Sequence, residues 1–412
     1  MTTLKRRQAH PLVRGTVRLW TRGPTVAVRR WRQRVLRAAY LRGSRRREPI
    51  EASDPLIIAT GQTLRRALIA LNEDKHRPAG YRVLILRPGS ITAEIWMGDL
   101  ATCMRHAGIE CLVLSPDAQT AQINAAIESF RPNVLIAVET PEVLHTLDLQ
   151  FLERYKRAHG CLRLFVPVWH AEAPRANVPR AQSTPAQVEE RRRLRWQGLT
   201  ADAYFSIFEP EFYQRFSYDP EGPAIDHETI PQGFNPFIDY PLQATRCYDY
   251  FMATSMTDER VEVAYRYLRP ILRGHRGIWA GPQWGFGLHS IAPAEMPLHY
   301  ARTRIALSPL VGFVRCYGAE VTHRVYAAAA CGTFQMTMPT PITHRYFTQE
   351  ELVQVATPAE YSRLFDHYLA HPQERNSIAL AALQRAYREH SCFHRVDRLV
   401  GHWDHWRRQG LF

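Results

Sequence analysis

The sequence lacks several features that would assign the protein to a membrane, secreted, disulfide-linked or zinc-binding class. Its 412 residues contain no uninterrupted run of 18 apolar residues, so we predict no transmembrane helix. The N-terminus has no continuous apolar core of the kind found in secretory signal peptides. The seven cysteines form no Cys-x-x-Cys pair and no Cys/His spacing typical of zinc. This favours reduced thiols in a cytoplasmic protein over a disulfide framework or a metal site.

Several sequence motifs of common enzymes are also missing. The chain contains no GxxxxGK[ST] phosphate loop, no HExxH pair of zinc proteases and no GxSxG nucleophile turn. Its length predicts two or three domains. Its hydrophobic content of 45% is enough for sizeable cores.

The positive charge is confined to one end of the chain. Residues 1–50 hold 15 Lys and Arg against one acidic residue, whereas the other 362 residues hold 38 basic and 38 acidic residues. The net charge of +14 therefore belongs to the N-terminal segment, and the body is neutral. A nucleic-acid partner for the body is disfavoured for the same reason.

The basic segment carries a helical pattern. Apolar side chains recur at helical spacing while arginines fall off that line, the two sets being Val28, Trp31, Val35 and Ala38 or Ala39, and Arg30, Arg34 and Arg37. One interpretation is an amphipathic helix on an anionic membrane surface, with Trp20 and Trp31 in the headgroup region. The others are a solvated arm, a nucleic-acid contact or an organelle transit peptide.

The body alternates apolar strands with amphipathic helices in two cycles. We predict an α/β protein with two tandem Rossmann-like domains, residues 51–232 and 233–390, followed by a helical segment at 391–412 and preceded by the basic extension. The Pro/Gly-rich stretch "IPQGFNPFIDYP" (230–241) is the expected linker. Because the first strand–helix turn, "LRPGSITAE", has no GxGxxG, dinucleotide binding is not expected there.

The second half of the chain resembles a known family. Within residues 321–395, "RVYAAAACG" and "YLAHPQER" resemble the C-terminal half of group 1 glycosyltransferases, particularly the branch that includes spore-maturation-type enzymes. The linker "IPQGFNPFIDY" is similar to the linker of that superfamily. The resemblance implies a GT-B fold, with a nucleotide-sugar donor held by the second domain and an acceptor by the first. The nucleotide sugar would be a substrate, and no cofactor is expected.

The segment "VTHRVYAAAACG" supplies the first candidate site residues. It predicts a helix whose first turn carries His323 and Arg324, with small residues behind them and Gly332 as the stop. A helix N-terminus together with a guanidinium suits a diphosphate, because free N–H groups and positive charge both face the anion. The alternative is a solvated arginine on a buried, alanine-rich helix.

Two glutamates that the resemblance implies are replaced here. Ala327 and Ala319 stand where the family has the carboxylates that contact the nucleotide ribose and the donor sugar. Glu320, Glu350 or Glu351 is expected to take over, or the donor is held differently, or catalysis is lost. For Glu350 and Glu351, an exposed acidic pair at a helix start is the competing interpretation.

Strand ends supply the other candidates. Arg260, Gly281 and Trp284 follow the first two strands of the second domain, where they can meet the diphosphate and stack on the base. His170 and Glu172 end a strand of the first domain and suit a general base or an acceptor contact. Ordinary turn chemistry and a satisfied histidine are the alternatives.

The function expected from these residues is transfer of a hexosyl or related unit to a glycan, lipid-linked or protein acceptor. Retention of configuration follows if the group 1 pattern holds. The absence of Asp-x-Asp disfavours the metal-dependent type of transferase, so no metal is expected. The alternatives are a nucleotide-sugar epimerase of the same fold and a catalytically silent binding module. The expected location is cytoplasmic, with peripheral membrane contact through residues 1–50.

Overall fold

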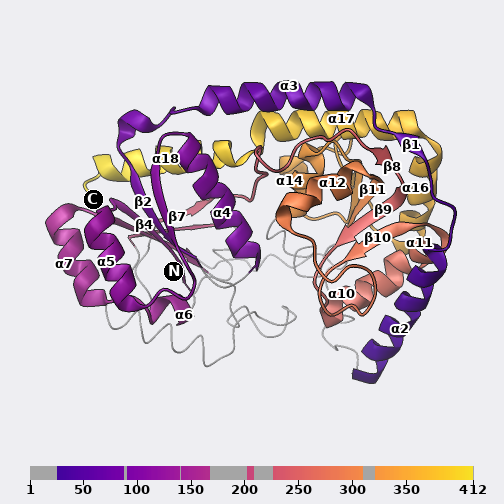
Figure 1. Cartoon of the computed structure of the whole chain (residues 1–412), viewed down its shortest axis with the longest axis horizontal. Coiled ribbons are helices and arrows are strands. Elements are labelled where there is room, and N and C mark those ends of the chain that lie inside the picture. The colour runs from indigo at the N-terminus through magenta and orange to yellow at the C-terminus, as the bar shows by residue number, and fades with distance from the viewer. Residues whose placement is uncertain are drawn as a thin grey trace, which may run out of the picture.

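The computed structural model describes residues 26–87, 91–139, 141–167, 202–207, 226–309 and 321–411. These residues form two parallel β-sheets that lie side by side, with helices between and around them (Figure 1). The expected α/β class and the two Rossmann-like units are confirmed.

The first sheet has the order β3-β2-β4-β5-β6-β7 and is parallel throughout. Its strands are β2 (Arg82–Leu86), β3 (Glu110–Leu114), β4 (Val134–Glu139), β5 (Leu162–Pro167), β6 (Ala203–Ser206) and β7 (Asp226–Thr229). The helices α4 (Ile91–His106), α5 (Thr120–Phe130), α6 (Pro141–Leu144) and α7 (Leu149–His159) connect them. Two helices, α6 and α7, lie between β4 and β5.

Alternation along β2 explains why both faces of this sheet are covered. Val83 and Ile85 pack in one apolar cluster with α4, whereas Leu84 and Leu86 pack in another with α5 and α7. Because successive side chains of a strand point to opposite faces, a strand that is apolar at every position must be buried on both.

The second sheet has the order β10-β9-β11-β12-β13 and is also parallel. Its strands are β9 (Tyr248–Ala253), β10 (Gly277–Ala280), β11 (Thr303–Ser308), β12 (Gln335–Thr337) and β13 (Val353–Gln354). Its helices are α10 (Asp258–Val263), α11 (Arg269–Gly274), α12 (Met296–Ala301), α14 (His323–Ala330), α15 (Thr343–Tyr346) and α16 (Pro358–Ala370). A π-helical stretch, Ala264–Leu268, joins α10 to α11.

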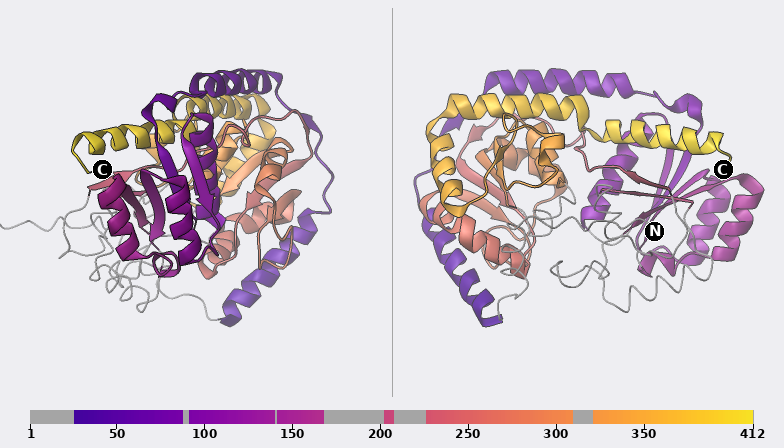
Figure 2. Two further views of the ribbon diagram at one scale, coloured as in Figure 1. Left: turned by 60° about the vertical axis from the view of Figure 1, so that its left-hand side comes forward. Right: turned by 180° about the vertical axis from the view of Figure 1, so that it is seen from behind.

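Long helices tie the two halves together. Helices α3 (Pro55–Asn72) and α17 (Pro372–Glu389) lie side by side across the molecule, and α18 (Cys392–Arg408) continues over the first sheet (Figures 1 and 2). At Gly61 of α3 an added Cβ would lie 2.3 Å from Pro241, so the close approach needs glycine. On α18, Trp403 packs edge-on against Tyr81, and Asp404 accepts a hydrogen bond from the Tyr81 hydroxyl.

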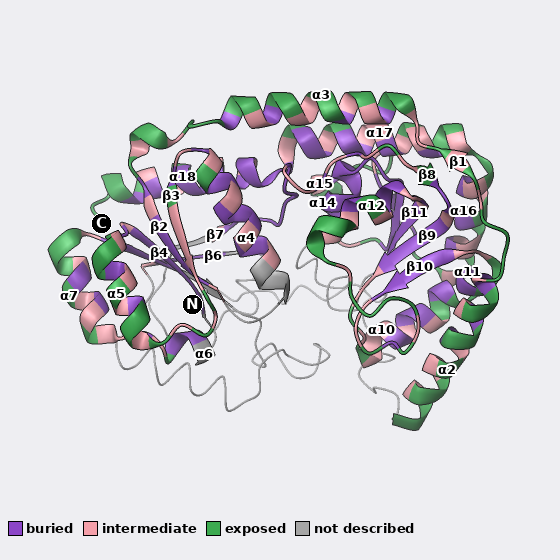
Figure 3. Cartoon of the chain, in the orientation of Figure 1, coloured by how far each residue is buried: buried purple, intermediate pink, exposed green. Residues whose placement is uncertain are grey.

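The basic extension is in part a folded helix of the second half. Helix α2 (Val26–Gly43) buries Leu36, Ala39 and Gly43, and an added Cβ at Gly43 would lie 2.1 Å from the Leu272 carbonyl of α11. After α2, the short strand β1 (Glu51–Ala52) pairs antiparallel with β8 (Thr245–Arg246). The outer faces of α2 and α3 are exposed while the strands of the second sheet are buried (Figure 3). A boundary at residue 51 therefore does not separate a loose tail from a body.

Candidate functional site

The order of the second sheet marks where a ligand site is expected. The chain leaves strand β9 through helices toward β10 on one side, and β11 lies on the other side of β9. In open α/β sheets, ligands bind outside the carboxyl ends of the strands at such a reversal of strand order. The carboxyl ends of β9 and β11, at Ala253 and Ser308, therefore define the candidate site.

Arg324 contacts the carboxyl end of β9, which is part of the candidate site. The helix α14 begins at His323, with Thr322 in the extended conformation as N-cap, so Arg324 stands in the first turn as predicted. The Arg324 Nη1 donates a hydrogen bond of 2.5 Å to the carbonyl of Ala253, the last residue of β9. The sequence places a guanidinium at a helix start, and the fold brings that guanidinium to the reversal point of the sheet.

His323 joins the two halves of the molecule. Its Nε2 lies 3.4 Å from Oδ2 of Asp99 on α4, which covers the first sheet, and 4.0 Å from Oδ2 of Asp239 in the linker. The His323 backbone N–H donates to Gln232 Oε1 at 2.5 Å. Asn235 Nδ2 donates to Asp99 Oδ1 at 2.8 Å, so the linker holds both the helix and the carboxylate.

Burial and charge act in opposite directions on this cluster. Burial alone would lower the pKa of His323, but the hydrogen bond to Asp99 and the charges of Asp239 and Asp99 outweigh it and raise that pKa. Burial raises the pKa of Asp239 to about 6, a rise that the His323 charge opposes and the Asp99 charge reinforces. The arrangement favours a protonated His323 beside the candidate site.

The loops after β9 and β10 are held by glycine and arginine. Gly281 has φ +143°, and an added Cβ there would lie 1.8 Å from the Thr254 carbonyl, so only glycine allows these two loops to approach. Arg260, on α10, donates to the carbonyl of Ser255 at 3.1 Å and also contacts its hydroxyl. Gly281 thus lies in the loop after β10, and Arg260 contacts the loop after β9 from the first turn of α10.

Trp284 does not have the role expected of it. Its side chain is 1% exposed and packs among Trp279 and Phe286, with ring centroids 4.8 Å and 5.9 Å away. Its Nε1 donates to the Thr254 carbonyl at 2.7 Å. An indole buried on both faces has no surface for a base, so the expected stacking is replaced by support of the β9 loop.

The helix that carries Arg324 is buried where the family has a glutamate. Ala327 is 2% exposed and lies in an apolar cluster with Phe251, Ile278 and Tyr300. A carboxylate would not be solvated there, and burying one without a partner is costly. The alanine therefore agrees with its surroundings in this structure.

The acidic pair Glu350 and Glu351 lies in a turn after Phe347. Glu350 is exposed, and Glu351 Oε2 accepts from the Thr348 backbone N–H at 2.9 Å. That bond closes a local turn before β13, whereas the competing interpretation placed the pair at a helix start. A ribose contact by either residue stays a prediction.

Three predicted residues lie outside the described residues: His170, Glu172 and Glu320. Their roles stay predictions. The residues that sequence reasoning missed are Asp99, Gln232, Asn235 and Asp239. The last three belong to the linker "IPQGFNPFIDY", whose polar residues stand between apolar ones, a signal that can be seen in the sequence once a linker is suspected.

Comparison with known proteins agrees with this geometry. Residues 260–401, less than half of the chain, match the model of a glycosyl transferase-like family. The match runs from α10 into α18 and so contains Arg324 and the strands β10 to β13, whereas β9 precedes it. This match does not identify the spore-maturation-type branch of the family. No curated protein matches the chain by sequence.

Solved structures resemble the chain over most of its length. Sucrose-phosphate synthase from Thermosynechococcus elongatus superposes with a TM-score of 0.56 at 10% identity, covering 80% of this chain and 100% of its own. HepE from Anabaena, in complex with UDP and glucose, gives 0.54 at 10% identity, with 79% and 99% covered. An alpha-glucosyltransferase in complex with UDP-glucose and DNA gives 0.52 at 11% identity, with 78% and 100% covered.

At such low identity these likenesses establish the fold, which is the GT-B architecture of two Rossmann-like domains. The family match in the second domain adds the class of enzyme. The chain is therefore a glycosyltransferase of the GT-B type.

Proposed function

We propose that this enzyme binds the diphosphate of a nucleotide sugar at the carboxyl end of the second sheet and transfers the sugar to an acceptor held by the first domain. The observation that carries the proposal is the Arg324 guanidinium, which reaches from the first turn of α14 to the last carbonyl of β9. A diphosphate there would meet the Arg324 guanidinium and the positive end of the α14 helix dipole.

The chemistry proposed for the donor is metal-independent. The leaving nucleoside diphosphate gains negative charge as the glycosidic bond breaks, and a guanidinium can stabilise that charge through two parallel hydrogen bonds. Arg260 and the Gly281 loop lie at neighbouring strand ends and are proposed as further donor contacts. A protonated His323, held by Asp99 and Asp239, offsets the charge of these carboxylates next to Arg324.

We propose a uridine nucleotide as the first donor to test. Two of the similar structures hold UDP or UDP-glucose. The DNA named with one of them does not make nucleic acid the proposed acceptor here, because residues 51–412 carry balanced charge. A glycan, a lipid-linked saccharide or a protein is proposed instead, with His170 and Glu172 contacting it, Glu320 near the donor sugar, and the configuration retained.

Arg324→Ala tests the donor site. Losing one charge-assisted contact costs roughly 1.5–3 kcal/mol, which weakens UDP binding by one to two powers of ten. Calorimetric titration of UDP into the wild type and the variant measures this. Arg273→Ala, an exposed arginine of α11, is the matched control and should leave UDP binding unchanged. Equal UDP affinity in folded Arg324→Ala protein would place the diphosphate elsewhere.

One observation favours a second candidate, a catalytically silent GT-B module. Ala327 replaces the glutamate that the family resemblance implies for the ribose, and its surroundings are apolar. Such a module would show no saturable binding of any nucleoside diphosphate. The same titration, extended over uridine, guanosine, adenosine and thymidine diphosphates, separates the two functions.

We also propose that the outer face of α2 contacts an anionic membrane. The helix presents exposed apolar side chains beside arginines: Val26 (55% exposed), Val28 (38%), Trp31 (52%) and Leu41 (46%), with Arg30, Arg34, Arg37 and Arg42. The Trp31 ring also packs on Tyr265 of the second half, with centroids 5.3 Å apart. Arg29 and Arg32 instead pair with Asp258 and Glu262 of α10, so they hold the helix in place. Among the described residues no helix is both long enough and apolar enough to cross a membrane.

Trp31→Ser tests this face without unfolding the protein. Deleting residues 1–50 would strip buried Leu36 from the second domain, so a point change is the cleaner perturbation. We expect weaker co-sedimentation with phosphatidylserine vesicles, because insertion of an exposed indole adds to the attraction between arginines and lipid. Deletion of residues 1–25 alone, which removes Trp20, measures the contribution of the preceding segment. Unchanged vesicle binding in Trp31→Ser protein would argue against this face.

A further inference from the structure

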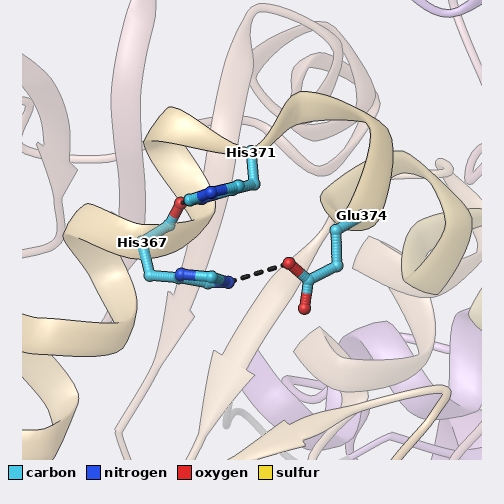
Figure 4. A group of neighbouring side chains, drawn as sticks. All are labelled: His367, His371 and Glu374. Carbon is cyan, nitrogen blue, oxygen red and sulfur yellow. Dashed lines mark hydrogen bonds and ion pairs between the residues drawn. The ribbon is translucent and has the colours of Figure 1, made fainter.

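The corner between α16 and α17 brings together three side chains that suit a metal ion. His367 lies in the last turn of α16, His371 stands between the helices, and Glu374 lies in the first turn of α17 (Figure 4). One ligand atom from each lies within 4.8 Å of the other two. The spacing His-x₃-His-x₂-Glu does not indicate a metal site in the sequence, because it spans a helix break and contains no cysteine.

The hydrogen bonds of this corner already direct the ligand atoms. The His371 Nδ1–H donates to the His367 carbonyl at 2.7 Å, which fixes the tautomer and leaves the lone pair on Nε2. His367 Nε2 lies 2.8 Å from Glu374 Oε2. The two imidazole rings stack with centroids 4.1 Å apart at an interplanar angle of 23°, so they project to the same side (Figure 4).

The backbone on both sides of the corner is anchored. Arg375, which is fully buried, donates from Nη1 to the Tyr368 carbonyl at 2.9 Å and so links α17 to α16 across the turn. Tyr368 packs on Phe334 with ring centroids 4.5 Å apart. Because the corner is held in this way, an ion would need only small side-chain movements to bind.

We infer that His367, His371 and Glu374 form a site for a divalent transition-metal cation of the Zn²⁺ class. Two imidazole nitrogens and one carboxylate are the ligands this class prefers, whereas Mg²⁺ and Ca²⁺ prefer oxygen alone. Ligand bonds of about 2.0–2.2 Å place neighbouring donors about 3.4 Å apart in a tetrahedron, so the 2.8 Å pair must open slightly. The side chains are 35% and 49% exposed at His367 and Glu374, which leaves the fourth position to water.

This site is separate from the donor site. Helix α16 follows β13 and runs back along the sheet, so its last turn lies at the amino ends of the strands. Two contacts agree: Tyr368 packs on Phe334, which precedes β12, and Asp366 pairs at 3.0 Å with His275, which precedes β10. The ion would thus hold the α16–α17 corner together and take no part in sugar transfer.

Binding must also compete with protons. His367 has to lose the proton from Nε2, which either moves to Nδ1 of the neutral ring or leaves the charged ring for solvent. His367 faces Glu374, the His371 ring and the Tyr368 ring, whose centroid lies 5.1 Å from that of His367. The charge of Glu374 also contributes to the raised pKa of Tyr368, after burial.

Titration of ZnCl₂ into the full-length, untagged protein tests the site. We expect one saturable site, weakened roughly tenfold or more by His367→Gln, His371→Gln or Glu374→Gln. His402→Gln is the matched control, because His402 of α18 pairs with Glu228 of β7 at 3.1 Å but lies outside the three-ligand cluster. Hydrogen exchange of residues 366–376 should slow on addition of Zn²⁺ in the wild type and in His402→Gln only.

Each outcome of these experiments either supports or overturns the proposed metal site. No saturable Zn²⁺ binding by the wild type, or equal binding by the wild type and His371→Gln, would overturn the site. If a histidine variant fails to fold, Glu374→Gln, a change at a half-exposed surface position, still decides the question. UDP affinity should be the same with and without Zn²⁺, so the result does not depend on the proposed function.

Discussion

The replacement of Glu51 by glutamine is expected to loosen the attachment of the N-terminal segment to the second domain. Glu51, on β1, lies among three arginines that come from three different elements. Its carboxylate pairs with Arg375 of α17, with Arg246 of β8 at 2.8 Å and with Arg304 of β11 at 3.0 Å. Burial opposes its ionisation, but the charges of Arg375 and Arg246 outweigh burial and lower the pKa of Glu51.

The magnitude follows from how deeply the arginines are buried. Arg375 has no exposed side-chain surface and Arg246 has 7%, so Glu51→Gln leaves two buried guanidinium groups without a counter-charge. Removing one partner of a buried ion pair costs about 3–5 kcal/mol. Because Glu51 itself is 22% exposed, we expect the lower end, about 3 kcal/mol.

Hydrogen exchange of α17 measures this loss locally. A change of about 3 kcal/mol in opening free energy makes exchange roughly a hundredfold faster. Glu48→Gln is the control, since Glu48 pairs with Arg276 at 3.3 Å with both side chains substantially exposed, and should cost less than about 1 kcal/mol. Similar, small effects of Glu51→Gln and Glu48→Gln would refute the reasoning.

Two further predictions concern the junction and the acceptor. His323→Gln should destabilise the junction most below pH 6.5 and progressively less above it, because the raised pKa of His323 contributes stability that is lost as the pH rises. Urea denaturation of the wild type and the variant at pH 6 and pH 8.5 measures this. A difference in stability that does not depend on pH would contradict it. His170→Ala should lower kcat with little change in UDP affinity if His170 contacts the acceptor, as steady-state kinetics and calorimetry would reveal; an equal loss in UDP affinity would place His170 in the donor site.

The pattern of apolar residues predicted the strands of the two sheets well, because a short apolar run such as β2 is typical of a buried strand. Every residue from Val83 to Leu86 is buried, and a run of that kind between helices has few other solutions. The helix that begins at His323 and ends before Gly332 was likewise visible, since Gly332 has φ +66° as a helix stop requires.

The tertiary partners of these elements were not visible in the sequence. The arginines of residues 26–43 predicted a solvent or membrane helix, yet two of them pair with Asp258 and Glu262 from more than 200 residues away. The tryptophan at 284 was expected in a binding loop because it follows a strand, but the same position leads into an aromatic cluster. Local patterns do not distinguish these outcomes, because they depend on which distant segment covers the surface.

The junction cluster shows the same limit at the candidate site. His323 was identified by its place in a helix, whereas Asp99 lies in the middle of α4 and carries no motif. Their contact at 3.4 Å exists only because the linker turns the second domain toward the first. Sequence reasoning could therefore predict the kind of ligand expected at α14 but not the residues that position it.

The most direct test of the account is calorimetric titration of UDP and UDP-glucose into the wild type and Arg324→Ala. The account predicts saturable binding of a nucleoside diphosphate by the wild type and binding weakened by one to two powers of ten in the variant. No binding of any nucleoside diphosphate, or equal binding by both proteins, would contradict it.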